Sequence, residues 1–191
     1  MKTKNIAFTA IRMQPFHKGH FRLIAEMLSE NELVIIGLGS VQIEKTSANP
    51  FTPKERTEFL KKVFGDTKKI KIVPLRDIGA VDKEAWSYNC MKRIKGSGIE
   101  TPNRYYGGSA TDIEWFKGMK NLNCETLEII NMERYSTNIM SGTEIRKALS
   151  NNSEEWKNHV PECIHELVED NYPKELTLKY NINLKKQKDN V

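Results

Sequence analysis

A six-residue apolar run, Leu33-Val34-Ile35-Ile36-Gly37-Leu38, contains no polar side chain. A strand of a parallel sheet is covered on both faces, so it is apolar throughout rather than at alternate positions. We therefore expect a buried central strand here. On either side of it along the chain, further strands are expected at Ile6–Ile11, Ile70–Val73, Asn103–Tyr106 and Leu127–Ile130.

Segments with apolar residues at helical spacing separate these strands. They cover residues 18–30, 53–64, 82–95, about 111–119, about 144–150 and about 160–170. This alternation predicts an α/β fold, with a parallel sheet of about five strands and helices on both faces. Ligands of such sheets bind at the carboxyl ends of the strands. The loops expected there are 11–20, 38–53, 74–82, 107–112 and 131–143.

The composition is that of a globular protein, with 38% hydrophobic and 29% charged residues among 191. We expect one domain over residues 1–175 and a flexible basic tail over 176–191. No apolar run approaches the roughly 20 residues of a membrane span, and the first residues do not resemble a signal peptide, which predicts a cytoplasmic protein. Three widely spaced cysteines argue against a disulfide framework. A net charge of +5 suits a protein that handles phosphates, whereas nucleic-acid binding is not expected.

The loop after the first expected strand, Arg12–His20, contains two of the four histidines, His17 and His20, three positions apart. Gly19 lets a ligand approach the backbone closely, and the unpaired N–H groups of a helix start attract anions. The loop therefore fits a phosphate site with two imidazoles. Histidines exposed at a helix start without a ligand are one alternative. A metal pair is another, although no third ligand is evident nearby.

A second loop, Ser141–Arg146, begins a later helix. Ser141 and Glu144 fit a capping box, which is a structural role. Arg146 lies one turn in, where its planar fork could grip phosphate oxygens beside the helix start. The pairing of these two loops in one α/β domain is stronger evidence for a nucleotide phosphate site than either loop alone.

These motifs, His17-Lys18-Gly19-His20 and Ser141–Arg146, resemble the two signatures of the nucleotidyltransferase superfamily. The resemblance narrows with Gly39-Ser40-Val41-Gln42 and with Asn49-Pro50-Phe51-Thr52, which is followed by Glu55-Arg56. This set is similar to the archaeal-type nicotinamide mononucleotide adenylyltransferases. The resemblance covers roughly residues 5–170, and the segment 96–125 matches poorly.

The resemblance implies a Rossmann-like nucleotidyltransferase fold and an enzyme that joins the AMP of ATP to nicotinamide mononucleotide, giving NAD and pyrophosphate. It implies Mg²⁺ as cofactor, without dedicated metal ligands from the protein. The catalytic residues would be His17, His20 and Arg146. Contacts with ATP and its phosphates would come from Arg12, Gln14, Lys18, Gly19, Ser141, Gly142 and Thr143. The acceptor would be held by Asp77, Trp86, Ser40 and Asn49. A turn-capping Asp77 and a core Trp86 are the alternatives for those two residues.

In the implied reaction the phosphate oxygen of the acceptor attacks the α-phosphorus of ATP in line, and no side chain is covalently modified. Such a step is catalysed by positioning and by stabilising charge on the phosphoryl oxygens. Imidazolium groups can donate to those oxygens near neutral pH. Mg²⁺ bound to phosphates keeps several waters and needs few protein ligands.

Three positions depart from the family pattern, and the first and third of them bear on the acceptor more than on the chemistry. Ile11 stands where relatives carry Gly, Ala48 replaces a basic residue, and Tyr106–Asp112 replaces a Ser-Gly-Asn type of loop. Other acceptors therefore remain as alternatives, namely phosphopantetheine, flavin mononucleotide, or an alcohol phosphate in a CTP-dependent reaction. A catalytically silent nucleotide sensor is the alternative from another class. A homo-oligomer and the choice between nicotinamide and nicotinate are left open by the sequence.

Overall fold

The computed structural model describes residues 4–79, 82–119, 126–132 and 138–178. Contacts within the chain divide it into two compact units. The described residues of the first unit are 4–12, 20–42, 67–79, 82–119 and 126–132, and those of the second unit are 13–19, 43–66 and 138–178. Most of the expected tail, from residue 179 on, lies outside the described residues.

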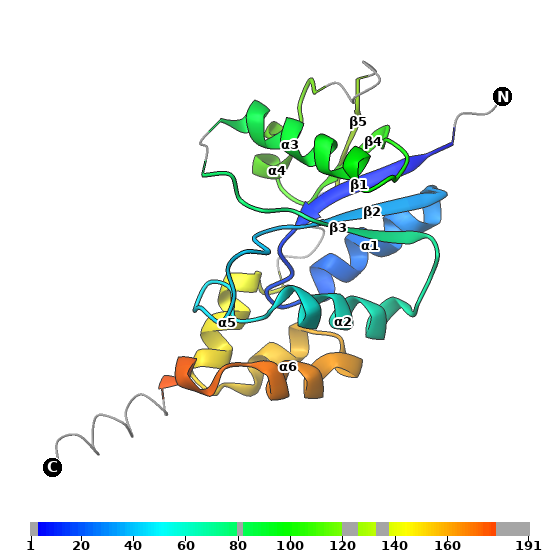
Figure 1. Ribbon diagram of the computed structural model, residues 1–191. Helices are drawn as coiled ribbons and strands as arrows, with labels where there is room; N and C mark the ends of the chain where they lie inside the picture. The colour runs from blue at the N-terminus through cyan, green and yellow to red at the C-terminus, as the bar shows by residue number, and fades with distance from the viewer. Residues whose placement is uncertain (1–3, 80–81, 120–125, 133–137, 179–191) are drawn as a thin grey trace, which may run out of the picture. The chain divides into compact units, whose positions relative to one another are not determined.

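The first unit is built on a five-stranded sheet whose paired strands are all parallel. Its strands are β1 (Ile6–Ile11), β2 (Leu33–Leu38), β3 (Ile70–Pro74), β4 (Arg104–Gly107) and β5 (Glu128–Asn131). Their spatial order is β3-β2-β1-β4-β5 (Figure 1), which confirms the expected parallel α/β sheet. Because the chain starts at β1 and extends the sheet in both directions, the order switches between β1 and β4. Open α/β sheets bind ligands beside such a switch, at the carboxyl ends of the strands.

Helices cover both faces of this sheet, as expected. They are α1 (Lys18–Glu30), α3 (Lys83–Gly96) and α4 (Ala110–Glu114). The first two residues of α1 belong to the second unit, and the rest, from His20 on, belong to the first. Figure 1 shows α3 and α4 on one face and α1 on the other. Neighbouring residues of β4 point to the two layers. The ring of Tyr105 stacks on Phe116 at 3.9 Å between ring centroids, whereas the hydroxyl of Tyr106 accepts from Asn31 Nδ2 and donates to Glu30 Oε2.

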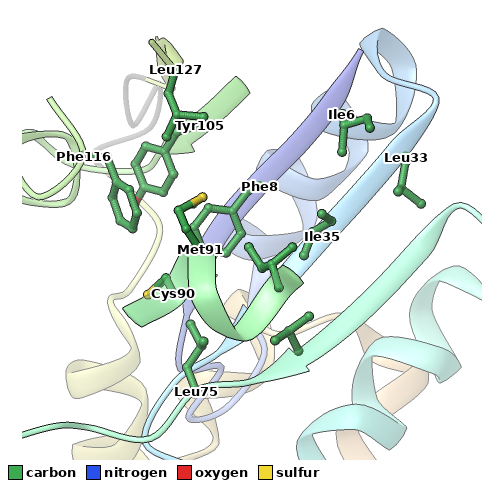
Figure 2. Close-up of a cluster of buried hydrophobic side chains, with 12 residues drawn as sticks. Ile6, Phe8, Leu33, Ile35, Leu75, Cys90, Met91, Tyr105, Phe116 and Leu127 are labelled. Atoms are coloured by element: carbon green, nitrogen blue, oxygen red, sulfur yellow. The ribbon is translucent and has the colours of Figure 1, made fainter. Parts of the chain in front are cut away.

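The core beneath α3 and α4 is shown in Figure 2. Alternate residues of β1 and β2 meet one face of α3 there, because side chains along a strand alternate between the two faces of the sheet. Phe8 is fully buried and lies 5.7 Å from Tyr105 and 5.5 Å from Phe116, measured between ring centroids. The cluster consists of Ile6, Phe8, Leu33, Ile35, Val73, Leu75, Cys90, Met91, Ile94, Tyr105, Phe116 and Leu127.

The second unit is helical. It contains α2 (Pro53–Phe64), α5 (Gly142–Ser150), α6 (His165–Asn171) and the 3₁₀ helices η1 (Glu154–His159), η2 (Glu162–Ile164) and η3 (Lys174–Leu176). Phe51 is central to its packing, with its ring centroid 5.2 Å from that of Phe59 and 6.1 Å from that of Tyr172. Both α2 and α5 start with a capping box, Thr52 with Glu55 and Ser141 with Glu144. The second box confirms the expectation from the sequence.

Some expected helix boundaries were wrong. The helix expected at 111–119 ends at Glu114, and a turn follows in which Gly118 has a φ of 72°. The helix expected at 160–170 is divided into η2 and α6. The 3₁₀ helix η1 was not predicted, because its single buried apolar residue, Trp156, gives no helical periodicity.

Two cysteines are described, and both are free thiols. Cys90 is buried in the core, where burial raises the pKa of its thiol, and Cys163 is exposed. Cys124 lies outside the described residues. Within the described part of the chain, no helix combines the length and the apolar character required to cross a membrane.

Replacing Phe8 with Ala should lower the free energy of unfolding by about 3–5 kcal/mol, because the ring fills a close-packed position in a central strand. Phe21→Ala is the matched control. Phe21 is 41% exposed, so its loss should cost less than about 1 kcal/mol. Urea unfolding of both variants measures the difference, and equal losses would contradict the assigned core.

Candidate functional site

Within the second unit, Gln14 joins the loop residues 13–19 to the segment before α2. The side chain of Gln14 is 2% exposed. Its Nε2 donates to the Phe51 carbonyl at 2.9 Å, and its Oε1 accepts from the Phe51 N–H at 2.9 Å. The carboxamide thus acts like one residue of a strand pair, and it fixes the loop against the segment before α2. The sequence-based assignment placed Gln14 among the phosphate-binding residues, but in this structure its side chain bonds the backbone of Phe51.

The segment before α2 forms a tight turn that contains Asn49. The Thr46 N–H donates to the Asn49 carbonyl and the Asn49 N–H donates to the Thr46 carbonyl, at 3.2 and 3.1 Å. Asn49 is 5% exposed, and its Oδ1 has no hydrogen-bond partner among the described residues. A buried acceptor without a partner costs about 1–3 kcal/mol. Its presence is consistent with a ligand group or a water that donates a hydrogen bond to Asn49.

Lys45 is the basic residue nearest to Ala48, but its ammonium group is held within the second unit. Its Nζ contacts Glu55 Oε1 at 2.8 Å and the Asn171 carbonyl at 3.3 Å. Glu55 is also the carboxylate of the α2 capping box, because it accepts from the Thr52 N–H at 2.8 Å. Lys45 therefore links the start of α2 to the end of α6.

Arg146 is held at two points in the first turn of α5. Its Nη1 donates to the Gln14 carbonyl at 2.9 Å, and its Nη2 donates to Thr143 Oγ1 at 3.0 Å. These two bonds set the plane of the guanidinium group. The ammonium group of a lysine has no such plane to fix. The charge of Arg146 also reaches Tyr172: burial raises the pKa of that hydroxyl, and the positive charge of Arg146 offsets part of the rise.

The two sequence motifs meet at Gly142. A Cβ placed on Gly142 would lie 3.3 Å from Arg146 Nη1, 3.4 Å from the Gln14 carbonyl oxygen and 4.0 Å from His17 Cδ2. Gln14 and Arg146 are 132 positions apart in the chain. Within the second unit, the start of α5 is therefore surrounded by an imidazole and a guanidinium group. A helix start with an oriented Arg fits an anion, and phosphate in particular.

The ring of His17 lies over Gly19. His17 Nδ1 accepts from the Gly19 N–H at 3.1 Å, and a Cβ on Gly19 would lie 2.9 Å from His17 Cε1. Gly19 was expected to leave room for a ligand, and here the absent Cβ leaves room for the imidazole of His17. The neighbouring Lys18 donates from Nζ to the Asn158 carbonyl at 2.7 Å. That bond is exposed, so it is weak enough for the ammonium group to exchange it for a phosphate.

In the first unit, Asp77 joins the loops that follow β2 and β3. Its Oδ1 accepts from Ser40 Oγ at 3.2 Å and its Oδ2 accepts from Gln42 Nε2 at 3.0 Å. The Asp77 N–H donates in turn to Gln42 Oε1 at 3.2 Å. Gln42 was not among the predicted site residues. Its contact with Asp77 could not be foreseen from the sequence, because the two residues are 35 positions apart.

Three further predicted site residues, Arg12, His20 and Trp86, belong to the first unit. The Cγ of Arg12 is 3.4 Å from the place of a Cβ on Gly39, so the stem of Arg12 passes over that glycine. His20 is in the first turn of α1. Trp86 is partly buried, with edge contacts to Trp115 and Phe116 at 5.4 and 5.8 Å between centroids. Trp86 therefore contributes to the core, and its partial exposure leaves it accessible to a ligand.

The described residues include no cluster of three or more His, Cys, Asp or Glu side chains that could hold a metal ion.

Replacing Gln14 with Ala should lower the free energy of unfolding by roughly 2–4 kcal/mol, because it leaves the buried N–H and carbonyl of Phe51 without their partners. Gln42→Ala is the control, since it removes a two-bond carboxamide contact at an exposed position and should cost less than about 1 kcal/mol. Denaturant unfolding of the two variants provides the measurement. A Gln14→Ala protein as stable as the control would show that this contact does not hold the loop.

Comparisons with known proteins agree on one family. Residues 12–148 match the cytidylyltransferase-like family. The chain is 34% identical, over 165 residues, to the nicotinamide-nucleotide adenylyltransferase of Methanococcus vannielii, a match that covers 85% of this chain and 87% of the relative.

Among solved structures, the chain resembles a bifunctional NMN adenylyltransferase/ADP ribose pyrophosphatase from Francisella tularensis, with a TM-score of 0.68, 22% identity and coverage of 84% of this chain. The complex of that protein with AMP and a manganese ion gives a TM-score of 0.62 and 25% identity, again over 84% of this chain. The chain spans only 45% of that bifunctional protein, so these similarities bear on the fold of one part of it. The family match covers more than half of the sequence, and the chain therefore belongs to the cytidylyltransferase-like family of nucleotidyltransferases.

Proposed function

We propose that this protein is an enzyme that transfers the AMP of ATP to nicotinamide mononucleotide, with release of pyrophosphate, and so makes NAD. One observation carries the proposal: in the second unit the imidazole of His17 and the guanidinium of Arg146 surround the start of α5 at Gly142. The archaeal relative named nicotinamide-nucleotide adenylyltransferase, which matches over most of both chains, supports this choice of reaction and acceptor.

The proposed chemistry uses positioning and charge stabilisation rather than a covalent intermediate. The phosphate oxygen of the acceptor attacks the α-phosphorus of ATP, the bond from that phosphorus to the bridging oxygen breaks, and pyrophosphate leaves with the electron pair. Negative charge grows on the phosphoryl and leaving oxygens. Donors that are already oriented stabilise this charge without reorganisation at the moment of reaction. His17, His20 and Arg146 are the donors that we assign to this task.

Arg146 is suited to the pyrophosphate end of ATP. Its guanidinium group is oriented by the Gln14 carbonyl and by Thr143 Oγ1, and it stands beside the N–H groups at the start of α5. Ser141, Gly142 and Thr143 supply that helix start, and Gly19 and Lys18 supply the start of α1. Arg12 and Gln14 complete the phosphate-binding set, Gln14 by fixing the loop and by orienting Arg146 through its carbonyl.

Mg²⁺ is the cation that we propose for the reaction. A related structure in complex with AMP and a manganese ion supports the use of a divalent cation by this kind of protein. When bound to the phosphates of ATP, such a cation neutralises part of their charge.

For the acceptor we propose contacts from Asn49, Asp77, Ser40 and Trp86. Asn49 offers a buried acceptor atom that no described residue satisfies. Asp77 is oriented by Ser40 and Gln42, which leaves its carboxylate fixed rather than free to rotate. Trp86 presents a partly exposed aromatic ring next to Trp115. Each of these groups suits part of a flat ligand that carries a carboxamide: an aromatic ring can stack on it, and carboxylate and amide oxygens can accept from its N–H groups.

The folded protein incubated with ATP, Mg²⁺ and nicotinamide mononucleotide should form NAD and pyrophosphate in equal amounts, with products identified by mass. Parallel reactions replace ATP with CTP and replace the acceptor with nicotinate mononucleotide, phosphopantetheine, flavin mononucleotide or an alcohol phosphate. Product with another acceptor alone would move the assignment to that acceptor. Nucleotide binding without pyrophosphate release in any reaction would identify a sensor rather than an enzyme.

Arg146→Lys keeps the positive charge but cannot reproduce the two bonds to Gln14 and Thr143. We expect kcat/KM for ATP to fall at least about 10-fold in Arg146→Lys and about 10²-fold or more in Arg146→Ala. Lys147→Ala is the control, because it removes an exposed positive charge from the same helix and should change little. The kinetics are measured with ATP varied at saturating acceptor, and a Lys variant as active as the wild type would remove Arg146 from the phosphate site.

A further inference from the structure

The protonation pattern of the His17 ring follows from one hydrogen bond. The Gly19 N–H points at His17 Nδ1, 3.1 Å away. A backbone N–H can only donate, so Nδ1 must carry a lone pair in this arrangement. A neutral imidazole has one N–H group and one acceptor nitrogen. With Nδ1 as the acceptor, the proton of His17 is on Nε2.

The ring can hold this orientation because Gly19 has no side chain. A Cβ on Gly19 would be 2.9 Å from His17 Cε1 and 3.0 Å from Nδ1, closer than real Cβ contacts allow. A Cβ on Gly142 would be 4.0 Å from His17 Cδ2, an ordinary contact, so the restriction on the ring comes from position 19. Any side chain at position 19 would therefore displace the ring from the Gly19 N–H.

The charged and titratable groups near His17 in the second unit come from α5, α1 and η1. From α5, the guanidinium of Arg146 lies beside Gly142 as the His17 ring does, and the carboxylate of Glu144 accepts from the Ser141 N–H at 2.7 Å. From α1, Lys18 donates to Asn158, and His20 lies three positions farther along the chain. From η1, His159 Nδ1 accepts from the Met140 N–H. A second proton on His17 would lose the Gly19 bond and add a positive charge beside Arg146.

We propose that His17 acts as a neutral donor, through Nε2–H, to the phosphoryl oxygens, and that the Gly19 N–H is the positioning group that selects this form. The inference rests on the proposed adenylyl transfer for its catalytic part. It differs from imidazolium catalysis in one respect: the proton stays on Nε2 throughout, and no positive charge on His17 is needed. The full positive charge at this point comes from Arg146.

The ring form is tested first without any reaction. Heteronuclear NMR of the free protein at about pH 7.5 distinguishes a protonated ring nitrogen from one with a lone pair, and loss of the signal in His17→Gln assigns it to His17. We expect a neutral ring with the proton on Nε2. A ring with the proton on Nδ1, or with both nitrogens protonated, would overturn the proposal. This result does not depend on whether the protein makes NAD.

The catalytic part is tested with a matched pair of amides. The side-chain nitrogen of Gln can reach the place of Nε2, whereas that of Asn reaches only the place of Nδ1. His17→Gln should keep kcat within about 10-fold of the wild type, and His17→Asn should lose about 10²-fold or more, the scale of one missing oriented donor. Equal losses in the two variants would contradict a neutral donor at Nε2.

The pH profile separates a neutral donor from an imidazolium. Between about pH 7 and pH 9, kcat of the wild type and of His17→Gln should change in parallel, because neither would need a proton that imidazole loses in this range. If the imidazolium were required, kcat of the wild type alone would fall steadily over this range. A wild type without dinucleotide formation would refute the proposed function, and the NMR result would still decide the form of the ring.

Discussion

A buried carboxamide is costly unless each of its polar atoms has a partner, and Gln14 meets this constraint in a way that organises the second unit. Its side chain forms both available backbone bonds of Phe51, while its own carbonyl accepts from Arg146. One residue thus joins three segments that are distant in the sequence. Because Gln14 is buried, its two bonds to Phe51 are not weakened by exchange with water. The loop that they fix also holds the carbonyl that orients the Arg146 guanidinium group.

The same arrangement explains why the helix start carries a glycine at position 142. The Gln14 carbonyl and Arg146 Nη1 approach the Cα of this residue so closely that a Cβ would lie 3.3–3.4 Å from both. The requirement is one of space and not of an unusual backbone angle, since Gly142 is helical. A larger residue would push the guanidinium group away from the carbonyl that orients it. Glycine at position 142 therefore leaves room for the hydrogen-bonded Arg146 side chain as well as for a ligand.

The parts of the fold that could be read from the sequence are those with local causes. The bounds of β1, β2, α1 and α2 match the expected ranges, because continuous apolar runs and a Thr52–Pro53 helix start define them. The strands β4 and β5 each begin one residue later than expected. They are short, and their bounds depend on pairing with neighbouring strands, which no local pattern records.

For the candidate site, the sequence predicted which loops carry the distinctive residues. It did not predict which hydrogen bonds their side chains make. Gln14 and His17 were predicted as site residues of one distinctive loop, yet the side-chain partner of Gln14 lies 37 positions away. Nor does a His-x-Gly-His pattern state which ring nitrogen is an acceptor. That information exists only in the distance between Gly19 N and His17 Nδ1. Long-range contacts and side-chain rotamers are decided by packing, and residue types alone leave them undetermined.

Positive charge near the two motifs is of two kinds, charges on flexible side chains and a charge that the fold orients. The sequence has an excess of five positive charges, but two basic residues near the motifs, Lys18 and Lys45, bond to carbonyl or carboxylate oxygens of the second unit. The ammonium group of a lysine on its flexible side chain can bind anions in many geometries, whereas the Arg146 guanidinium, held by two hydrogen bonds, favours one. In a transfer between phosphates, discrimination between ground state and transition state comes from geometry. The groups expected to contribute most are therefore those that the fold orients, namely Arg146, the start of α5 and the imidazole held by Gly19.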